Sequence, residues 1–451
     1  MVWQIGSSVG VKPNQNIFCN TPWYEIHIYW DGSLGICCQE DHKLYHESDG
    51  QYNISTMSIQ DWFNSEPVRR FRTGILGDQP LSECRRCYIE EEHGGNSRRF
   101  KSNQKSVIFT TTAFEHSFQQ SPGYKHFAHS DQHQGQTTSV PIDMHIDLGN
   151  FCNLACKMCN PRASSTIASQ QVRWGMENSR QYLGTDWTRD QAVWNNFKKQ
   201  LVALAGLNNI HFMGGETVLT DRFEDLVDTM IEHEKFDVCL SFVTNGTVFK
   251  PTLINKLKKF RRVGIEVSIE TVDDHNAYQR QGTDTALVLA NIDQYLDHCN
   301  GSSITVALRP APSALSIGYY TQVLQYALEK HLIVKSNLCY RPRFLSAEIL
   351  PESVKQQYQQ PYLALLDQLA KINVDSDYNA SDPNNHRLAI KEQALMCLKI
   401  LETPTPADSD QQLEAMVRHC ERWDRVYGYD ARKLYPELGK TLDRYGYDIS
   451  G

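Results

Sequence analysis

The sequence predicts an α/β fold whose central part is an open, partial barrel of six strand–helix units. From residue 142 onward, short apolar segments of strand length alternate with longer segments of helical periodicity. Strands that alternate with helices pair in parallel through right-handed crossovers. The six units occupy residues 142–345, whereas a closed TIM barrel has eight. We therefore expect a partial (β/α)6 TIM-like barrel.

The strands and helices of this barrel are expected in a regular order. The strands are expected at 142–149, 209–215, 238–245, 264–270, 303–309 and 336–340. The helices are expected near 162–173, 190–206, 220–234, 251–261, 285–299 and 317–331.

Two further regions flank the barrel. Residues 1–97 are expected to form a small cysteine-rich α+β domain, with strands at 24–30 and 34–38, a turn at Asp31-Gly32 and a helix over 58–76. Residues 346–451 are expected to be a helical extension, with helices at 352–372, 386–402 and 410–426.

The segment 98–141 is rich in Ser, Thr, Gln and His and is expected to be a long linker. Its His126, His129 and His133 have the spacing of ligands on a helix. Irregular polar segments contain such spacings by chance, so we favour a plain linker over a zinc site here.

Composition excludes several classes of protein. The net charge of −8 argues against non-specific binding to nucleic acid or to anionic lipid. The first residues lack a basic start and an apolar run, and no stretch of about 18 apolar residues occurs. We expect a cytoplasmic protein without a membrane span.

The chain has 13 cysteines, and eight of them fall in three groups. An odd count in a reducing compartment argues against a disulfide framework and favours metal or redox chemistry. The three groups are Cys19, Cys37 and Cys38; Cys84 and Cys87; and Cys152, Cys156 and Cys159. The remaining five are expected to be core residues: Cys239, Cys299, Cys339, Cys397 and Cys420.

The strongest pattern is Cys152-x3-Cys156-x2-Cys159, directly after the first barrel strand. Cubane 4Fe–4S clusters usually take four thiolates, so three thiolates leave one iron open for a ligand. A structural zinc site is the alternative. Further polar residues are expected at the carboxyl ends of the strands, where barrels collect functional groups: Gly214, Gly215, Glu216, Thr244, Asn245, Ser268, Glu270 and Arg309.

In spacing and order, these residues resemble the radical S-adenosylmethionine (SAM) superfamily over residues 142–345. The resemblance implies that SAM chelates the open iron. One-electron reduction then cleaves the sulfonium bond of SAM and yields a 5′-deoxyadenosyl radical, which abstracts hydrogen from a substrate. It also implies roles for individual residues: Gly214, Gly215 and Glu216 at the SAM amino group, Met158 on the adenine, Ser268 and Glu270 at the ribose, Thr244 and Asn245 nearby, and Arg309 at a carboxylate of SAM or substrate. Three positions depart from common family residues: Met158, Thr217 and Glu270.

The N-terminal cysteines resemble a twitch domain, a shortened SPASM domain that holds an auxiliary 4Fe–4S cluster. The implied ligands are Cys19, Cys37, Cys84 and Cys87; we favour Cys37 over Cys38 because it fits a Gly32-x4-Cys spacing. In most relatives this domain follows the barrel. A four-cysteine zinc site is the alternative. The pairs Arg85-Arg86 and Arg98-Arg99 are expected to be a solvated face; the alternative is that they tune the cluster potential or meet an acidic substrate.

The resemblance implies an enzyme that receives electrons from a reductant such as a flavodoxin or ferredoxin. Relatives with SPASM or twitch domains often modify peptides or proteins, so a peptide substrate is favoured over a small molecule. Two hypotheses of other classes remain: a non-catalytic iron–sulfur or zinc protein, and an electron-transfer protein with two closed clusters. The latter needs a fourth protein ligand near Cys152, and the local sequence offers none.

Overall fold

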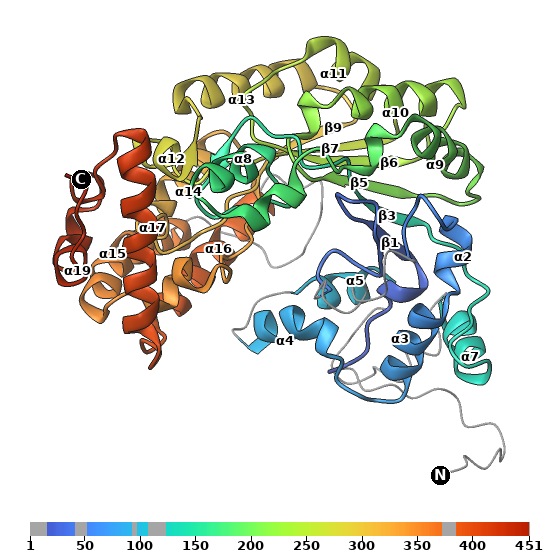
Figure 1. Ribbon diagram of the computed structural model, residues 1–451, viewed down its shortest axis with the longest axis horizontal. Coiled ribbons are helices and arrows are strands. Elements are labelled where there is room, and N and C mark those ends of the chain that lie inside the picture. The colour runs from blue at the N-terminus through green and yellow to red at the C-terminus, as the bar shows by residue number, and fades with distance from the viewer. Residues whose placement is uncertain (1–15, 41–51, 93–96, 107–122, 372–384, 451) are drawn as a thin grey trace.

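An eight-stranded sheet forms the centre of the protein in the computed structural model, which describes residues 16–40, 52–92, 97–106, 123–371 and 385–450 (Figure 1). The strand order is β10-β9-β7-β6-β5-β3-β1-β2. The strands are β1 (Glu25–Ile28), β2 (Leu34–Gly35), β3 (Asp143–Asp147), β5 (Asn209–Met213), β6 (Cys239–Thr244), β7 (Arg262–Val267), β9 (Ile304–Leu308) and β10 (Ile333–Val334). The six strands from β3 to β10 are all parallel, which confirms the partial (β/α)6 barrel.

The last strand lies earlier in the chain than the sequence analysis predicted. The expected strand 336–340 is an extended segment beside the end of β9, and β10 covers Ile333–Val334 instead. The amides of Asn337 and Cys339 donate to the carbonyl oxygens of Pro310 and Pro312. Proline has no N–H to donate in return, so a two-sided ladder cannot continue.

The barrel helices cover the apolar face of the sheet. They are α8 (Ser165–Arg173), α9 (Gln191–Ala203), α10 (Asp221–Glu232), α11 (Pro251–Leu257), α13 (Thr285–Cys299) and α14 (Tyr320–Glu329). Phe223 of α10, for example, packs its ring against Phe212 and Phe242 of the sheet. Figure 1 shows α9, α10, α11 and α13 on one side of the sheet and the N-terminal region on the other.

The opposite, inner face of the sheet is polar. His145, His211 and Ser241 are register partners on β3, β5 and β6, so they lie side by side on this face. Glu266 of β7 and Glu25 of β1 lie on it as well. Because parallel barrel strands are usually apolar on both faces, this polar lining marks the inner face as the functional side.

The N-terminal hairpin is part of the barrel sheet. β1 and β2 pair antiparallel across the expected turn, where Gly32 has a φ of 84°. On its other edge β1 pairs in parallel with β3, with Glu25 opposite Asp143 and His27 opposite His145. This long-range pairing was not predicted, and it means that the first region and the barrel share one sheet.

Elsewhere in the N-terminal region, more helix is present than the sequence predicted. The single helix expected over 58–76 is two helices, α2 (Ile59–Phe63) and α3 (Glu66–Leu76), because Pro67 starts a new helix. The expected linker contains the helices α5 (Arg98–Ser106) and α7 (Tyr124–Gln132), which follow α4 (Arg85–Glu92). Phe127 of α7 is fully buried against Phe18 and Trp23, and this contact fixes α7 on the core of the N-terminal region.

The three linker histidines do not converge. His126 contacts the hydroxyl of Thr138, whereas His133 contacts the carbonyl oxygen of His129 and stacks on its ring. Among the described residues, these three histidines do not belong to a group of three or more ligand-type side chains that lie close together.

The C-terminal region is helical, as expected. It contains α15 (Glu352–Ala370), α16 (Asn385–Glu402), α17 (Ser409–Tyr427), α18 (Ala431–Leu434) and α19 (Gly439–Arg444). These helices gather at one end of the barrel beside α8 and the short α12 (Asp274–Gln279) (Figure 1). None of the helices in the described segments combines the length and apolar content that crossing a membrane requires.

Candidate functional site

The loop that carries Cys152, Cys156 and Cys159 is fixed by a two-stranded ribbon and by α8. β4 (Ala155–Cys156) pairs antiparallel with β8 (Arg280–Gln281), which places the backbone of Cys156 opposite Arg280. From the start of α8, Ser164 donates to the carbonyl oxygen of Leu154 (2.7 Å). Thr166 donates to that of Cys152 (2.6 Å). The loop is therefore tied down at several points before any ligand binds.

The three thiols of this loop lie close enough to affect one another. Burial, together with the neighbouring thiols, raises the pKa of Cys152 and of Cys159 to about 12. Burial also raises the pKa of Cys156, but the charge of Arg280 opposes this effect. All three cysteines are free. Three converging thiols beside a fixed positive charge fit an iron–sulfur cluster that has one open iron.

Glu216 is the centre of a buried hydrogen-bonded group at the carboxyl end of the sheet. Its side chain accepts from the hydroxyl of Thr244 (2.6 Å) and from the backbone amides of Asn245 (2.6 Å) and Val218 (3.2 Å). Asn245 in turn donates to Asn153 of the cysteine loop (2.8 Å). Burial raises the pKa of Glu216, and these donors oppose the rise. The structure thus joins Glu216, Thr244 and Asn245 to the cysteine loop.

Gly214 and Gly215 make room for the cysteine loop itself. Both have positive φ angles, 83° and 56°. A Cβ atom on Gly214 would lie 2.6 Å from the carbonyl oxygen of Gly149, and one on Gly215 would lie 2.2 Å from that of Phe151. The amide of Glu216 donates to the same Phe151 oxygen (2.7 Å). The paired glycines therefore allow the close approach of the cysteine-loop backbone.

Glu270 is joined to Arg280, a residue that the sequence analysis missed. Arg280 donates to one oxygen of Glu270 (2.9 Å), and the amide of Ala311 donates to the other (2.6 Å). Both side chains are buried. Ser268, also buried, follows the end of β7 together with Glu270. No local pattern marks Arg280, because its partners Cys156 and Glu270 lie in other segments.

The remaining two residues expected near SAM, Met158 and Arg309, have different neighbours. Met158 is half-buried and packs on the main core. Arg309 pairs with Glu266 on the neighbouring strand, and Lys335 donates to the second oxygen of Glu266 (2.7 Å). Although burial opposes it, these two cations lower the pKa of Glu266 to about 2. Arg309 is thus held on the polar inner face.

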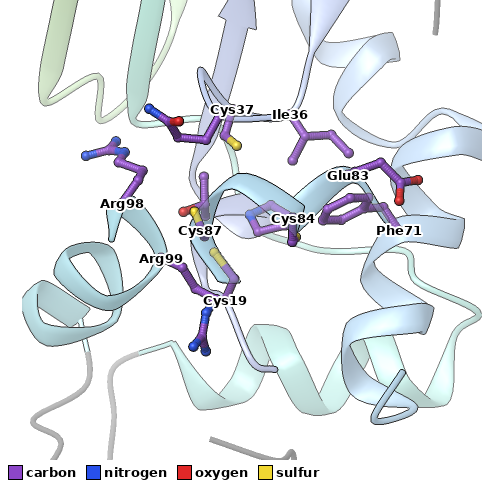
Figure 2. A pocket seen from close by; sticks show the side chains of 12 residues that line it. Cys19, Ile36, Cys37, Phe71, Glu83, Cys84, Cys87, Arg98 and Arg99 are labelled. Atoms are coloured by element: carbon purple, nitrogen blue, oxygen red, sulfur yellow. The ribbon is translucent and has the colours of Figure 1, made fainter. Parts of the chain in front are cut away.

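The four N-terminal cysteines expected to bind a metal line a single pocket (Figure 2). Cys19 precedes a short helical turn, Cys37 follows β2, Cys84 precedes α4 and Cys87 lies within it. Burial raises the pKa of all four thiols, to about 11 in the case of Cys87. Four thiols around one pocket fit a cluster or metal ion whose ligands all come from the protein.

Cys38 does not line this pocket, although it is adjacent to Cys37. Its sulfur lies instead with Glu25 and His145 near the inner face of the sheet, where the ligand atoms of the three residues are within 4.8 Å of one another. Burial raises the pKa of Cys38 to about 12, and Arg98 and Arg309 oppose this.

The expectation that Arg98-Arg99 is a solvated face is wrong. Arg99 is 6% exposed, pairs with Glu91 and lines the cysteine pocket. Arg98 also lines this pocket and pairs with the buried Glu25. In contrast, Arg85 and Arg86 are exposed, as expected. Among the five cysteines expected in the core, four are buried and Cys239 is partly exposed.

Two domain families match the chain. Residues 146–310 match the Radical SAM superfamily. Residues 19–88 match SPASM, an iron–sulfur cluster-binding domain, in the predicted position before the barrel. The first match contains the three-cysteine loop and the second contains all four pocket cysteines. No curated protein matches the chain in sequence.

Several solved structures match the chain at low identity. "Native anSMEcpe with bound AdoMet" is 17% identical with a TM-score of 0.39, covering 52% of this chain and 62% of that one. The form with bound AdoMet and Kp18Cys peptide is 16% identical, with a TM-score of 0.37 and coverages of 51% and 62%. SuiB of Streptococcus suis bound to precursor peptide SuiA is 12% identical, with a TM-score of 0.36 and coverages of 69% and 64%. The chain therefore spans less than two thirds of each of these structures.

Proposed function

We propose, from the premise that this chain belongs to the radical SAM superfamily and carries an N-terminal SPASM-type domain, that it is an enzyme acting on a C–H bond of its substrate. A 4Fe–4S cluster with SAM bound supplies one-electron cleavage of SAM to a 5′-deoxyadenosyl radical, which abstracts a hydrogen atom. Cys152, Cys156 and Cys159 are the proposed ligands of that cluster.

One observation carries the proposal. The free thiols of the cysteine loop lie beside two buried carboxylates, Glu216 and Glu270, at the carboxyl ends of parallel strands. A carboxylate at this end suits the ammonium group of SAM, which we assign to Glu216. Thr244 and Asn245 hold that carboxylate in place from the next strand.

The other predicted residues take supporting roles around SAM and the substrate. Met158 packs on the adenine, and Ser268 and Glu270 face the ribose. Arg280 donates to Glu270 and places its positive charge beside Cys156 of the cysteine loop. Because Arg309 is paired with Glu266 on the inner face, we assign it to the substrate rather than to SAM.

The pocket of Cys19, Cys37, Cys84 and Cys87 would hold an auxiliary 4Fe–4S cluster. Four protein ligands leave no open iron, so this cluster serves electron transfer or structural support. Zinc is the alternative occupant. Iron and acid-labile sulfide analysis separates them: two clusters require about eight irons and eight sulfides per chain, and one cluster requires about four of each.

The first experiment measures SAM cleavage directly. The protein is reconstituted anaerobically with iron and sulfide and mixed with SAM and dithionite, and 5′-deoxyadenosine is quantified by chromatography. We expect product from the native protein and none from the Cys152→Ala/Cys156→Ala/Cys159→Ala variant. A protein with both clusters intact that releases no 5′-deoxyadenosine would contradict the proposal.

The proposed substrate is a peptide or protein, the class favoured by the SPASM-type domain. The inner face offers both charge signs, from Glu25 and Arg98 to Glu266 and Lys335. A flavodoxin or ferredoxin in the cytoplasm would supply the electrons. To test the substrate class, the active enzyme is mixed with either deuterated peptides or deuterated small metabolites, both prepared from one cell culture. Deuterium in 5′-deoxyadenosine from the peptides alone supports a peptide, and deuterium from the metabolites alone refutes it.

A further inference from the structure

A second set of ligand-type side chains lies between the cysteine pocket and the inner face of the sheet. Glu25 of β1 and His145 of β3 are diagonal neighbours on adjacent parallel strands and point to the same face. Cys38 reaches them from the chain after β2. One ligand atom from each of the three residues lies within 4.8 Å of the others, and Glu25 Oε1 is 3.8 Å from His145 Nε2.

Two of these side chains, Glu25 and His145, are buried with a polar atom unpartnered. Glu25 is 3% exposed, and its Oε1 has no hydrogen-bond partner among the described residues. His145 is 9% exposed, and its Nδ1 likewise has none in this part of the chain. A buried carboxylate oxygen without a donor loses its hydration uncompensated, so it needs a water or an ion to satisfy it.

Arg98 organises the carboxylate of Glu25. Its guanidinium donates to Oε2 of Glu25, whereas Oε1 lies 3.8 Å from Nε2 of His145. A second group that holds one oxygen of a carboxylate while the other binds metal is a common supporting arrangement. The guanidinium also lies 3.4 Å from Nε2 of His145, so metal binding must exchange this long contact for a coordinate bond.

We propose that Glu25, Cys38 and His145 bind a single divalent transition-metal ion, with zinc as the best match. Thiolate, imidazole and carboxylate are the three ligand types that zinc takes in proteins. A tetrahedral zinc site separates its ligand atoms by about 3.3–3.8 Å, from bond lengths of about 2.0–2.3 Å. The ligand atoms of the present group lie within 4.8 Å of one another, so side-chain rotations that shorten these separations by up to about 1.5 Å close the group. Three protein ligands leave the fourth position open toward a water or substrate.

The proposal gives the adjacent cysteines separate roles. Cys37 faces the pocket with Cys19, Cys84 and Cys87, and Cys38 faces Glu25 and His145. Two neighbouring residues thus serve two metal sites. The mixed-ligand site does not compete with the auxiliary cluster for a thiol.

Zinc X-ray absorption tests this site without interference from iron. The full chain is reconstituted with iron and sulfide so that the cluster cysteines are occupied, and it is then incubated with Zn²⁺ and desalted. We expect about one zinc per chain, with one sulfur at about 2.3 Å and two or three nitrogen or oxygen atoms at about 2.0–2.2 Å. No retained zinc, or a shell of four sulfurs from the auxiliary pocket, overturns the proposal.

Variants then assign the ligands. Cys38→Ser and His145→Gln should each lose the retained zinc while keeping the iron content of the native protein. Cys239→Ser, which changes a partly exposed cysteine at the start of β6, should keep the zinc. Full zinc retention in both ligand variants overturns the assignment. If a variant also loses iron, the zinc X-ray absorption spectrum of the native protein decides between the two sites: one sulfur with two or three nitrogen or oxygen atoms supports the proposed site, and four sulfurs overturn it.

Discussion

The ammonium group of Lys157, inside the cysteine loop, lies 3.8 Å from Oδ1 of Asp424 on α17. Both side chains are completely buried. The ammonium group also lies 3.9 Å from the ring centre of Tyr278 and 5.0 Å from that of Trp423. The other oxygen of Asp424 accepts from the hydroxyls of Tyr278 and Tyr447. The C-terminal helices therefore hold the cysteine loop through the residue that follows Cys156.

Asp424→Leu should destabilise the protein by about 3–5 kcal/mol, because it leaves the charge of Lys157 buried without a partner. Denaturant unfolding of the reconstituted protein measures this change. The double variant Lys157→Met/Asp424→Leu removes both charges and should recover most of the loss. Equal stability of the native protein and the single variant would contradict the ion pair.

Gly215→Ala should reduce the iron retained by the three-cysteine loop. The new methyl group would lie 2.2 Å from the carbonyl oxygen of Phe151, in addition to the cost of a φ of 56°. We expect a loss of more than 1 kcal/mol. Gly301→Ala is the matched control, since its φ is 68° with open space around it. Unfolding and iron analysis of both variants separate the clash from the φ effect, and equal iron in the two would argue against close packing on the loop.

Arg280→Met should lower 5′-deoxyadenosine formation by about 10–100-fold, the usual effect of removing a group that supports metal ligands. The change leaves Glu270 buried without its 2.9 Å partner and removes the positive charge beside Cys156. Arg262→Met, at an exposed position of β7, is the control. The rate of 5′-deoxyadenosine formation, normalised to iron content, measures the effect. A native rate in Arg280→Met would show that Arg280 does not support the site.

Cys37→Ala and Cys38→Ala should differ in iron content. Only Cys37 lines the pocket of the auxiliary site, so Cys37→Ala should lose up to about four irons, the content of one cubane. Cys38→Ala should keep them. Mössbauer spectroscopy of protein reconstituted with iron-57 counts the clusters directly. The reverse result would show that Cys38 is the ligand.

The pH dependence of stability should report on His275, which joins α12 to the C-terminal region. Burial lowers the pKa of His275, but its contacts with Asp273 (2.9 Å) and the carbonyl oxygen of Leu434 (2.7 Å) raise it more, so the net pKa is raised. A raised pKa in the folded state stabilises the protein fully below the unfolded value of about 6.5. This stabilisation is lost as the pH rises through the folded-state pKa.

His275→Gln should therefore cost more at pH 6 than at pH 8. We expect about 1.5 kcal/mol at pH 6, the lower end for a hydrogen bond to a charged group. Unfolding of both proteins at the two pH values measures the difference. A cost that is the same at both pH values would mean that His275 is neutral throughout.

The sequence was sufficient for features encoded locally. Alternating segments predicted the parallel barrel, and close spacing identified the cysteine loop. The sequence did not reveal contacts between distant segments, such as β1 with β3, or Lys157 with Asp424, because neither partner carries a local signal. The ion pair of Arg98 was missed for the same reason, since its partner Glu25 is distant in the sequence.

The parallel pairing of β1 with β3 has a consequence for how the chain folds during synthesis. The backbone of Glu25 cannot pair until its register partner Asp143 has been synthesised. Ribosomes add about 5–20 residues per second. For about 6 to 24 seconds the edge of β1 that later pairs with β3 is exposed, and it can pair with a wrong strand. Of the pocket cysteines, Cys19 is made just before that interval, and Cys37, Cys84 and Cys87 are made within it. An iron–sulfur carrier that loads this pocket early would hold the nascent hairpin in a shape ready to receive β3.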